Sequence, residues 1–269
     1  MRRGLRAAAA LGAAALVLGA AVGGLAGNGP PAPDPRGSRA ALSAARPMPL
    51  SGITVALDPG HQLGNHRFPR QTGALVPAGG FRKPCNTTGT ATGTGVAEAT
   101  VNYWISRRVA SRLQALGAEV RFTRLYNSER FWGPCIDARG RFGARVGADL
   151  EVSLHADGAA SSAHGFHVIT PVSRAPWTDD IARPSLRLSR ALRSALLAGA
   201  VPRSSYAGSG TGLVARSDLG TLNLADVPIA MIEIGNMRNA SDARRMTSRA
   251  GQDRYADAVV RGIRAYLSL

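Results

Sequence analysis

The chain has few acidic side chains, few aromatic ones, two cysteines and a single lysine, Lys83. Its 269 residues include 33 Lys+Arg and 17 Asp+Glu, for a net charge of +16, and aromatic residues make up 5% of the sequence. The basic residues are spread along the chain without interleaved aromatics, and no nucleic-acid-binding motif is present, so we expect no nucleic acid partner. A charge of this size predicts attraction to a polyanion, although the codon bias of a GC-rich genome also enriches arginine.

The longest apolar run near the N-terminus, residues 7–22, is short for a membrane-spanning helix. It follows three arginines and precedes a stretch of small residues, which is the pattern of a secretory signal peptide. We therefore assign residues 1–27 as a signal peptide, with an uncleaved anchor as the alternative. The expected location is outside the cytoplasm, secreted or in the cell envelope (periplasm or cell wall). Removal of residues 1–27, which hold three arginines and no acid, lowers the net charge from +16 to +13.

The two cysteines, Cys85 and Cys135, are fifty positions apart. In an exported protein this predicts one disulfide bond that closes a long loop. The alternative is metal binding, but neither cysteine has a closely spaced Cys or His partner.

The remaining chain reads as a linker followed by one domain. Residues 28–50 are rich in Pro, Ala, Arg and Ser and predict a flexible linker. From residue 51 onward, predicted strands and helices alternate, which indicates a single α/β domain over residues 51–269. We expect a mostly parallel, twisted sheet flanked by helices. The expected strands are 53–57, 118–122, 149–155, 165–170 and 227–235, and the expected helices are 96–116, 136–146, 184–197 and 253–267.

One long segment, residues 62–97, fits neither pattern. It is rich in Gly, Thr and Pro and poor in aliphatic residues. A stretch of this length without regular structure inside a domain is either functional or disordered. A bond from Cys85 to Cys135 would anchor it at one point.

Three polar side chains are expected at one edge of the sheet. His61 and His155 each follow an apolar strand, and Glu98 opens the helix after the long segment. Because the carboxyl ends of parallel strands meet at one edge, these side chains are predicted to lie together. Two His and one Glu are a known ligand set for catalytic zinc, with water in the fourth position. We therefore predict that His61, Glu98 and His155 bind Zn²⁺.

A fourth residue, Glu233, interrupts the apolar strand 227–235. An unpaired carboxylate in such a run is costly, so it requires a partner, and a cation is the obvious one. A carboxylate beside a zinc-activated water can take its proton and pass it to a leaving amine. We predict that Glu233 is the catalytic base.

Each residue also has a purely structural interpretation. Glu98 suits a helix N-terminus, where an acid is favoured by the helix dipole. His155 would also be explained as a hydrogen-bonded core histidine, and Glu233 as the partner of an arginine. The other histidines, His66, His164 and His167, do not follow strand ends, so we leave them out of the metal site.

Four motifs in order resemble the zinc-dependent N-acetylmuramoyl-L-alanine amidases, the amidase type 3 family of cell-wall hydrolases. They are VALDPGH at 55–61, Glu98 at the start of a long helix, SLHAD at 153–157 and IEIGNMRN at 232–239. The resemblance covers residues 51–269 and implies a zinc site at His61, Glu98 and His155 and a catalytic glutamate at Glu233. It also implies the substrate: the amide between the lactyl group of N-acetylmuramic acid and L-alanine in peptidoglycan.

The sequence departs from the family pattern at three places. Gln62-Leu63 replaces the usual Gly-Gly, and Asp157 stands where Asn is common. The 62–97 segment is longer than in the simple family pattern and resembles the secreted actinobacterial members. These changes leave the expected zinc ligands intact.

Two other functions remain open on the sequence alone. One is a non-catalytic peptidoglycan-binding protein of the same fold, which would not need a costly carboxylate at Glu233. The other is a zinc carboxypeptidase-like peptidase, although such sites usually place His and Glu close together on one segment. We expect a monomer, and we expect the basic surface of the enzyme to be attracted to acidic wall polymers.

Overall fold

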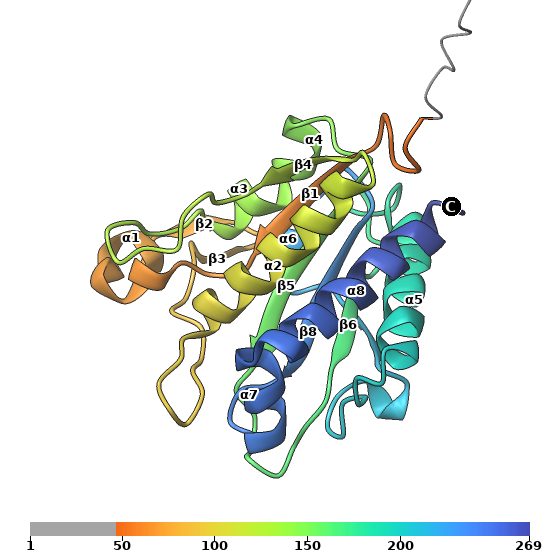
Figure 1. Cartoon of the computed structure of the whole chain (residues 1–269). Helices are drawn as coiled ribbons and strands as arrows, with labels where there is room; N and C mark the ends of the chain where they lie inside the picture. The colour runs from red at the N-terminus through yellow and green to blue at the C-terminus, as the bar shows by residue number, and fades with distance from the viewer. Residues whose placement is uncertain (1–46) are drawn as a thin grey trace, which may run out of the picture. The chain divides into compact units, whose positions relative to one another are not determined.

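Six strands of the computed structural model form one sheet in the order β4-β1-β5-β8-β6-β7 (Figure 1). Their bounds are β1 Thr54–Pro59, β4 Glu119–Phe122, β5 Leu150–Asp157, β6 His167–Pro171, β7 Leu213–Arg216 and β8 Ile229–Asn236. Strands β4, β1, β5 and β8 are mutually parallel, whereas β6 is antiparallel to β8 and parallel to β7. The expected α/β class with a mostly parallel sheet is therefore confirmed, with a reversed pair at one edge.

The structure describes residues 47–269. The predicted signal peptide (1–27) and the predicted linker up to residue 46 lie outside the described residues. Leu50, at the end of that linker, is fully buried, and its backbone N–H donates to the Leu116 carbonyl. Within residues 47–269, no helix combines the length and the apolar composition that crossing a bilayer requires.

Helices cover both faces of the sheet. One face carries the three long helices α2 (Glu98–Ala115), α5 (Ala182–Ala198) and α8 (Arg249–Tyr266). The short helices α3 (Ile136–Gly140), α4 (Phe142–Arg145) and α6 (Gly220–Asn223) lie on the other side of the sheet (Figure 1). Helix α7 (Ala240–Thr247) follows β8 and precedes α8. The predicted helix 136–146 is thus two short helices, α3 and α4, separated by Arg141.

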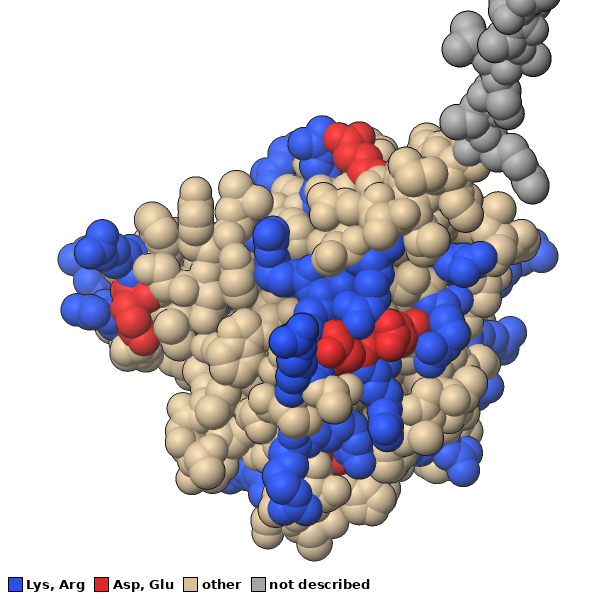
Figure 2. Space-filling model, in the orientation of Figure 1, with Lys and Arg blue, Asp and Glu red and all other residues tan. Residues whose placement is uncertain are grey.

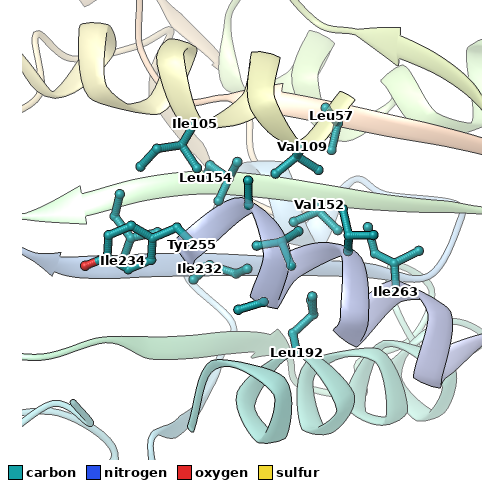
Figure 3. Packing of buried hydrophobic residues seen from close by; sticks show 14 of the residues in the cluster. Leu57, Ile105, Val109, Val152, Leu154, Leu192, Ile232, Ile234, Tyr255 and Ile263 are labelled. Atoms are coloured by element: carbon teal, nitrogen blue, oxygen red, sulfur yellow. The ribbon is translucent and has the colours of Figure 1, made fainter. Parts of the chain in front are cut away.

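The main core lies under the three long helices. Side chains alternate along a strand, so one set of residues on β1, β5 and β8 faces α2 and α8. This set includes Leu57, Val152, Leu154, Ile232 and Ile234 and packs on Ile105, Val109, Leu192, Tyr255 and Ile263 (Figure 3). The alternate positions, among them Asp58, Ser153, His155 and Glu233, therefore project from the opposite face.

The 62–97 segment is ordered. It contains a 3-10 turn η1 (Leu63–Arg67), helix α1 (Pro69–Gly73) and a hairpin of β2 (Leu75–Pro77) and β3 (Arg82–Pro84). Hydrogen bonds and a disulfide hold the segment in place, so it needs few aliphatic side chains and shows no hydrophobic periodicity. A second 3-10 turn, η2 (Gly208–Gly210), precedes β7.

The predicted disulfide between Cys85 and Cys135 is present. It joins the end of the hairpin to the residue before α3, and the Ile136 N–H donates to the Cys85 carbonyl beside it. The adjacent Asn86 side chain donates to the Pro134 carbonyl at 2.7 Å. The bond therefore fixes two segments that both reach the candidate site described below.

Replacing both cysteines by serine is expected to lower the free energy of unfolding. By the chain-entropy model, closing a loop of this length stabilises a fold by ~4 kcal/mol. Urea unfolding of the Cys85→Ser/Cys135→Ser variant should show a lower midpoint, matched by the wild type under reducing conditions. An unchanged midpoint in both samples would contradict a stabilising disulfide.

Candidate metal centre and active site

The first predicted ligand, His61, lies just after β1, where the sequence Asp58-Pro59-Gly60 terminates the strand. Gly60 permits the turn, since a Cβ there would lie 2.4 Å from the His155 ring. His61 has a φ of 58°, a left-handed conformation that is uncommon for a residue other than glycine. Such strain persists only where surrounding contacts fix the backbone. The close approach of Gly60 brings the two histidines together.

The predicted ligands His61, Glu98 and His155 form one cluster. Glu98 Oε1 lies 3.2 Å from His61 Nε2 and 3.1 Å from His155 Nδ1. One ligand atom from each residue lies within 4.8 Å of the others. The His61 and His155 rings meet edge to face with centroids 4.8 Å apart. Sequence reasoning placed these side chains at one sheet edge, and the structure brings all three together.

Groups outside the cluster hold two of the ligands, His61 and Glu98, in orientation. His61 Nδ1 lies 3.0 Å from the Thr87 carbonyl, so a proton on Nδ1 donates to that oxygen and leaves Nε2 free as a lone-pair donor. Glu98 Oε1 accepts from the Ala156 N–H, and Oε2 accepts from the Thr90 N–H. This arrangement, in which outer groups fix the tautomer and the carboxylate, is typical of metal sites.

The electrostatics of the cluster suit a cation. Burial by itself would raise the pKa of Glu98, but the two imidazoles outweigh it and lower the pKa well below its ordinary value. Burial would lower the pKa of His61, but the Glu98 carboxylate outweighs it and raises the pKa. A nearly buried carboxylate is thus shared between two imidazoles. Two imidazole nitrogens and one carboxylate oxygen are a donor set that zinc accepts, so these residues fit the metal that the sequence predicted.

Glu233 lies beside this cluster on β8. It is the register partner of His155 on β5 and of His167 on β6. Its Oε2 atom is buried and has no hydrogen-bond partner among the described residues. Burial, together with the charges of Asp157 and Glu98, raises the pKa of Glu233 well above its ordinary value. The residue therefore has an unsatisfied carboxylate oxygen next to the cluster.

His61, His155 and Glu233 line one cleft of about 240 Å³ on the α3–α6 side of the sheet. The other walls come from the hairpin end, α3 and α6, at Lys83, Asn86, Ile136, Leu219 and Thr221, among others. A wider groove of about 930 Å³ is lined by the 88–95 loop, Leu63, Glu129 and Arg238. The segment 86–95 thus borders both the cleft and the wider groove.

A polar cluster of Tyr206, Asp157 and His167 lies near Glu233 and was not predicted from the sequence. Tyr206 donates a hydrogen bond of 2.6 Å to Asp157 Oδ2, and His167 Nδ1 lies 3.6 Å from the same oxygen. His167 is nearly buried and does not join the metal cluster. His66 instead pairs with Glu129 at 3.3 Å on the surface, and His164 lies in the loop before β6.

Two buried arginines hold the turn that carries His61. Arg139, only 2% exposed, pairs with Asp58 and donates to the carbonyls of Pro59 and His61. Arg124 donates to the Pro59 carbonyl at 2.9 Å and to the Ala99 carbonyl at 2.6 Å. Burial, with Arg139 nearby, lowers the pKa of Arg124 to about 9. These contacts join the end of β1 to the start of α2, where Glu98 lies.

Replacing Arg139 by lysine should loosen the metal site without unfolding the chain. Lysine keeps the charge opposite Asp58 but has a single ammonium in place of the guanidinium fork that reaches six acceptors. Because outer-shell changes typically cost about 10–100-fold in metal affinity, we expect a loss in that range. Competition with a zinc-binding dye measures it.

The matched control is Arg141→Lys, two residues along on the protein surface. It should leave zinc affinity unchanged. Equal zinc affinities for the wild type and Arg139→Lys would show that the buried arginine does not position His61.

Gln62, which stands where the family usually has glycine, has a structural role. Its Oε1 accepts from the N–H groups of Leu63 and Ser128, and its Nε2 donates to the Tyr126 carbonyl. Gln62 therefore attaches the turn after His61 to the 126–128 loop.

A mostly parallel α/β sheet with a His-Glu-His cluster at its carboxyl edge and a second carboxylate beside it has the arrangement of a metal-dependent hydrolase. The sequence matches the family model described as N-acetylmuramoyl-L-alanine amidase over residues 55–265. It is 37% identical over 227 residues to the N-acetylmuramoyl-L-alanine amidase Rv3717 of Mycobacterium tuberculosis, covering 84% of this chain and 91% of the relative. The chain belongs to the N-acetylmuramoyl-L-alanine amidase family.

Solved structures agree with this assignment. The apo N-acetylmuramyl-L-alanine amidase Ami1 from Mycobacterium abscessus matches with a TM-score of 0.75 and 40% identity, over 81% of this chain and 100% of that one. Ami1 from Mycobacterium smegmatis matches with a TM-score of 0.76 and 37% identity, over 81% and 98% of the two chains. The resemblance inferred from the four motifs is confirmed.

Proposed function

We propose that this protein is a zinc-dependent amidase that cleaves the bond between N-acetylmuramic acid and L-alanine in peptidoglycan. The observation that carries the proposal is Glu233, whose buried Oε2 has no partner and which lines the same cleft as His61 and His155. A buried carboxylate oxygen without a hydrogen-bond partner lowers stability, and such perturbed groups are concentrated at functional sites. Family membership supplies the substrate class.

His61, Glu98 and His155 would hold the metal. When bound, zinc supplies Lewis acidity at this position and makes a water molecule more acidic. Glu233 takes the proton that the attacking water loses as its oxygen bonds to the amide carbonyl carbon. The C–N bond then breaks, and Glu233 returns the proton to the leaving nitrogen of L-alanine. Burial and the charges of Asp157 and Glu98 raise the pKa of the Glu233 carboxyl, and a raised pKa makes its carboxylate a stronger base for this exchange.

The shape of the surface fits a polymeric substrate. The cleft at Glu233 takes the scissile bond, and the wider groove bordered by the 88–95 loop gives the attached glycan or stem peptide a path along the same edge. Residues 51–269 form the catalytic domain in this proposal. We further propose export through the signal peptide at 1–27, action in the cell envelope as a monomer, and attraction of the basic surface to acidic wall polymers.

A soluble pair of substrates separates the amidase from a peptidase. One is a muramoyl-tripeptide and the other the same tripeptide with a free amino terminus. Release of the intact tripeptide from the first and no cleavage of the second supports the proposal. Loss of single amino acids from the second would favour the carboxypeptidase-like alternative, and zinc binding without any cleavage would favour the binding-only alternative.

A further inference from the structure

A basic groove lies on the other face of the sheet, between α2 and α8. It has a volume of about 630 Å³ and is lined by Trp104, Arg107, Arg108, Ser111, Arg112, Thr247, Arg249 and Gln252. These residues come from the outer surfaces of the two helices and from the end of α7. The catalytic cleft is on the α3–α6 side, so the two sites share no lining residue.

The lining of this groove contains four arginines and no acidic residue. Two of them are fixed by a row of aspartates along α8. Arg108 and Arg112 both donate to Asp253 Oδ1, at 2.8 and 2.7 Å, and Arg112 also donates to Asp257. Figure 2 shows this acidic row as a red band with blue arginine surface on both sides.

The other two arginines, Arg107 and Arg249, are exposed and make no ion pair among residues 47–269. The Arg107 guanidinium lies 5.3 Å from the centre of the Phe122 ring, a cation–π contact that leaves its N–H donors without an acceptor among the described residues. Two arginine forks are therefore available to an anion, and a guanidinium fork matches the oxygens of a phosphate.

The groove also presents an aromatic ring and two hydroxyls. Trp104 on α2 is 40% exposed, whereas the core-facing residues of the same helix are buried. An exposed indole beside cationic groups offers an apolar face for a sugar ring and an N–H donor at its edge. Ser111 and Thr247 add hydroxyls that can bond to sugar or phosphate oxygens.

We propose that the α2–α8 groove binds a phosphodiester-linked sugar polymer of the cell wall. The inference deepens the proposed attraction to acidic wall polymers by assigning it to one site. A concave groove with one aromatic ring and separated arginine forks suits a single sugar-phosphate chain better than a flat bilayer. Because this groove opens on the face away from Glu233, the anchored protein keeps its cleft free for peptidoglycan.

The test compares two variants with the same loss of charge. Arg107→Ser/Arg249→Ser removes the free groove arginines, and Arg183→Ser/Arg190→Ser removes two exposed arginines on α5. The probes are purified walls before and after hydrofluoric acid has removed their phosphodiester polymers. We expect the groove variant to bind intact walls about tenfold more weakly, because each charge-assisted hydrogen bond contributes substantially. The α5 variant should bind nearly as the wild type does.

Further readouts distinguish the outcomes. Trp104→Ala should also weaken binding to intact walls, and none of these variants should bind stripped walls more weakly than the wild type does. All should cleave a soluble muramoyl-tripeptide at the wild-type rate, so failure of the groove proposal is separate from failure of the amidase proposal. Equal loss in both arginine variants would mean that net charge alone acts and would overturn the site. Groove-dependent binding to anionic phospholipid vesicles, with none to intact walls, would overturn the polymer as ligand.

Discussion

Glu233→Gln is expected to lower kcat for amide hydrolysis by ~10²–10⁴, the range that general acid–base catalysis contributes. Glutamine keeps the shape of the side chain but cannot take a proton from water at neutral pH. The buried position of Oε2 without a partner means that this substitution breaks no hydrogen bond. KM and zinc content should therefore change little, and stability should be retained or increased because a costly buried carboxylate is removed.

The measurement is the initial rate on a muramoyl-tripeptide, with metal content and thermal unfolding on the same samples. Glu119→Gln, at an exposed position on β4, is the matched control and should behave as the wild type. A Glu233→Gln enzyme that retained full kcat would exclude this residue as the base. A variant that lost zinc as well as activity would assign it a different role.

Glu98→Gln is expected to have the second large effect, on metal binding. Glu98 is the anionic member of the cluster, lies within 3.2 Å of both imidazoles and is nearly buried. Glutamine is similar in shape but neutral, so the site loses its charge. The expected loss of zinc affinity exceeds the roughly 10–100-fold typical of outer-shell changes, and activity at low zinc should be lost with it.

Zinc content after dialysis against a weak chelator checks this expectation, with Glu119→Gln again as control. Activity of the wild type should disappear with a strong chelator and return with added zinc. Stoichiometric zinc in Glu98→Gln after dialysis would show that the metal binds elsewhere.

The sequence predicted the centre of this fold well because its strands have simple signals. β1, β5 and β8 are apolar runs that end in polar residues, and parallel pairing follows from the helices between them. This was enough to place His61, Glu98 and His155 at one edge. The order of β6 and β7 could not be predicted, since the antiparallel pairing of β6 with β8 depends on a long excursion between them.

The composition of the chain does not reveal which residues support the site. With 33 basic residues in the chain, nothing in the sequence separates buried Arg124 and Arg139 from the exposed ones. Their roles depend on carbonyl groups of the turn at residues 59–61, and such contacts have no sequence pattern. The hairpin of β2 and β3 was also not predicted from the sequence, because its short strands are largely exposed.

An isolated carboxylate in an apolar strand does not by itself mark a catalytic residue in this chain. Glu151 on β5 is fully buried, more so than Glu233, and burial raises the pKa of its carboxyl well above the ordinary value. Glu151 lies at the N-terminal end of β5, and its Oε2 accepts from the Gly143 N–H of α4. Position beyond the middle of the strand, toward the carboxyl edge, is therefore what distinguishes Glu233.

The most direct test of the account is mass spectrometry of the soluble products released from purified peptidoglycan. The protein should be folded under oxidising conditions and loaded with zinc. For the proposed amidase, we expect stem peptides with a free N-terminal alanine and glycan strands that keep intact lactyl groups. Products cleaved within the stem peptide or within the glycan, with the lactyl–alanine bond intact, would contradict it.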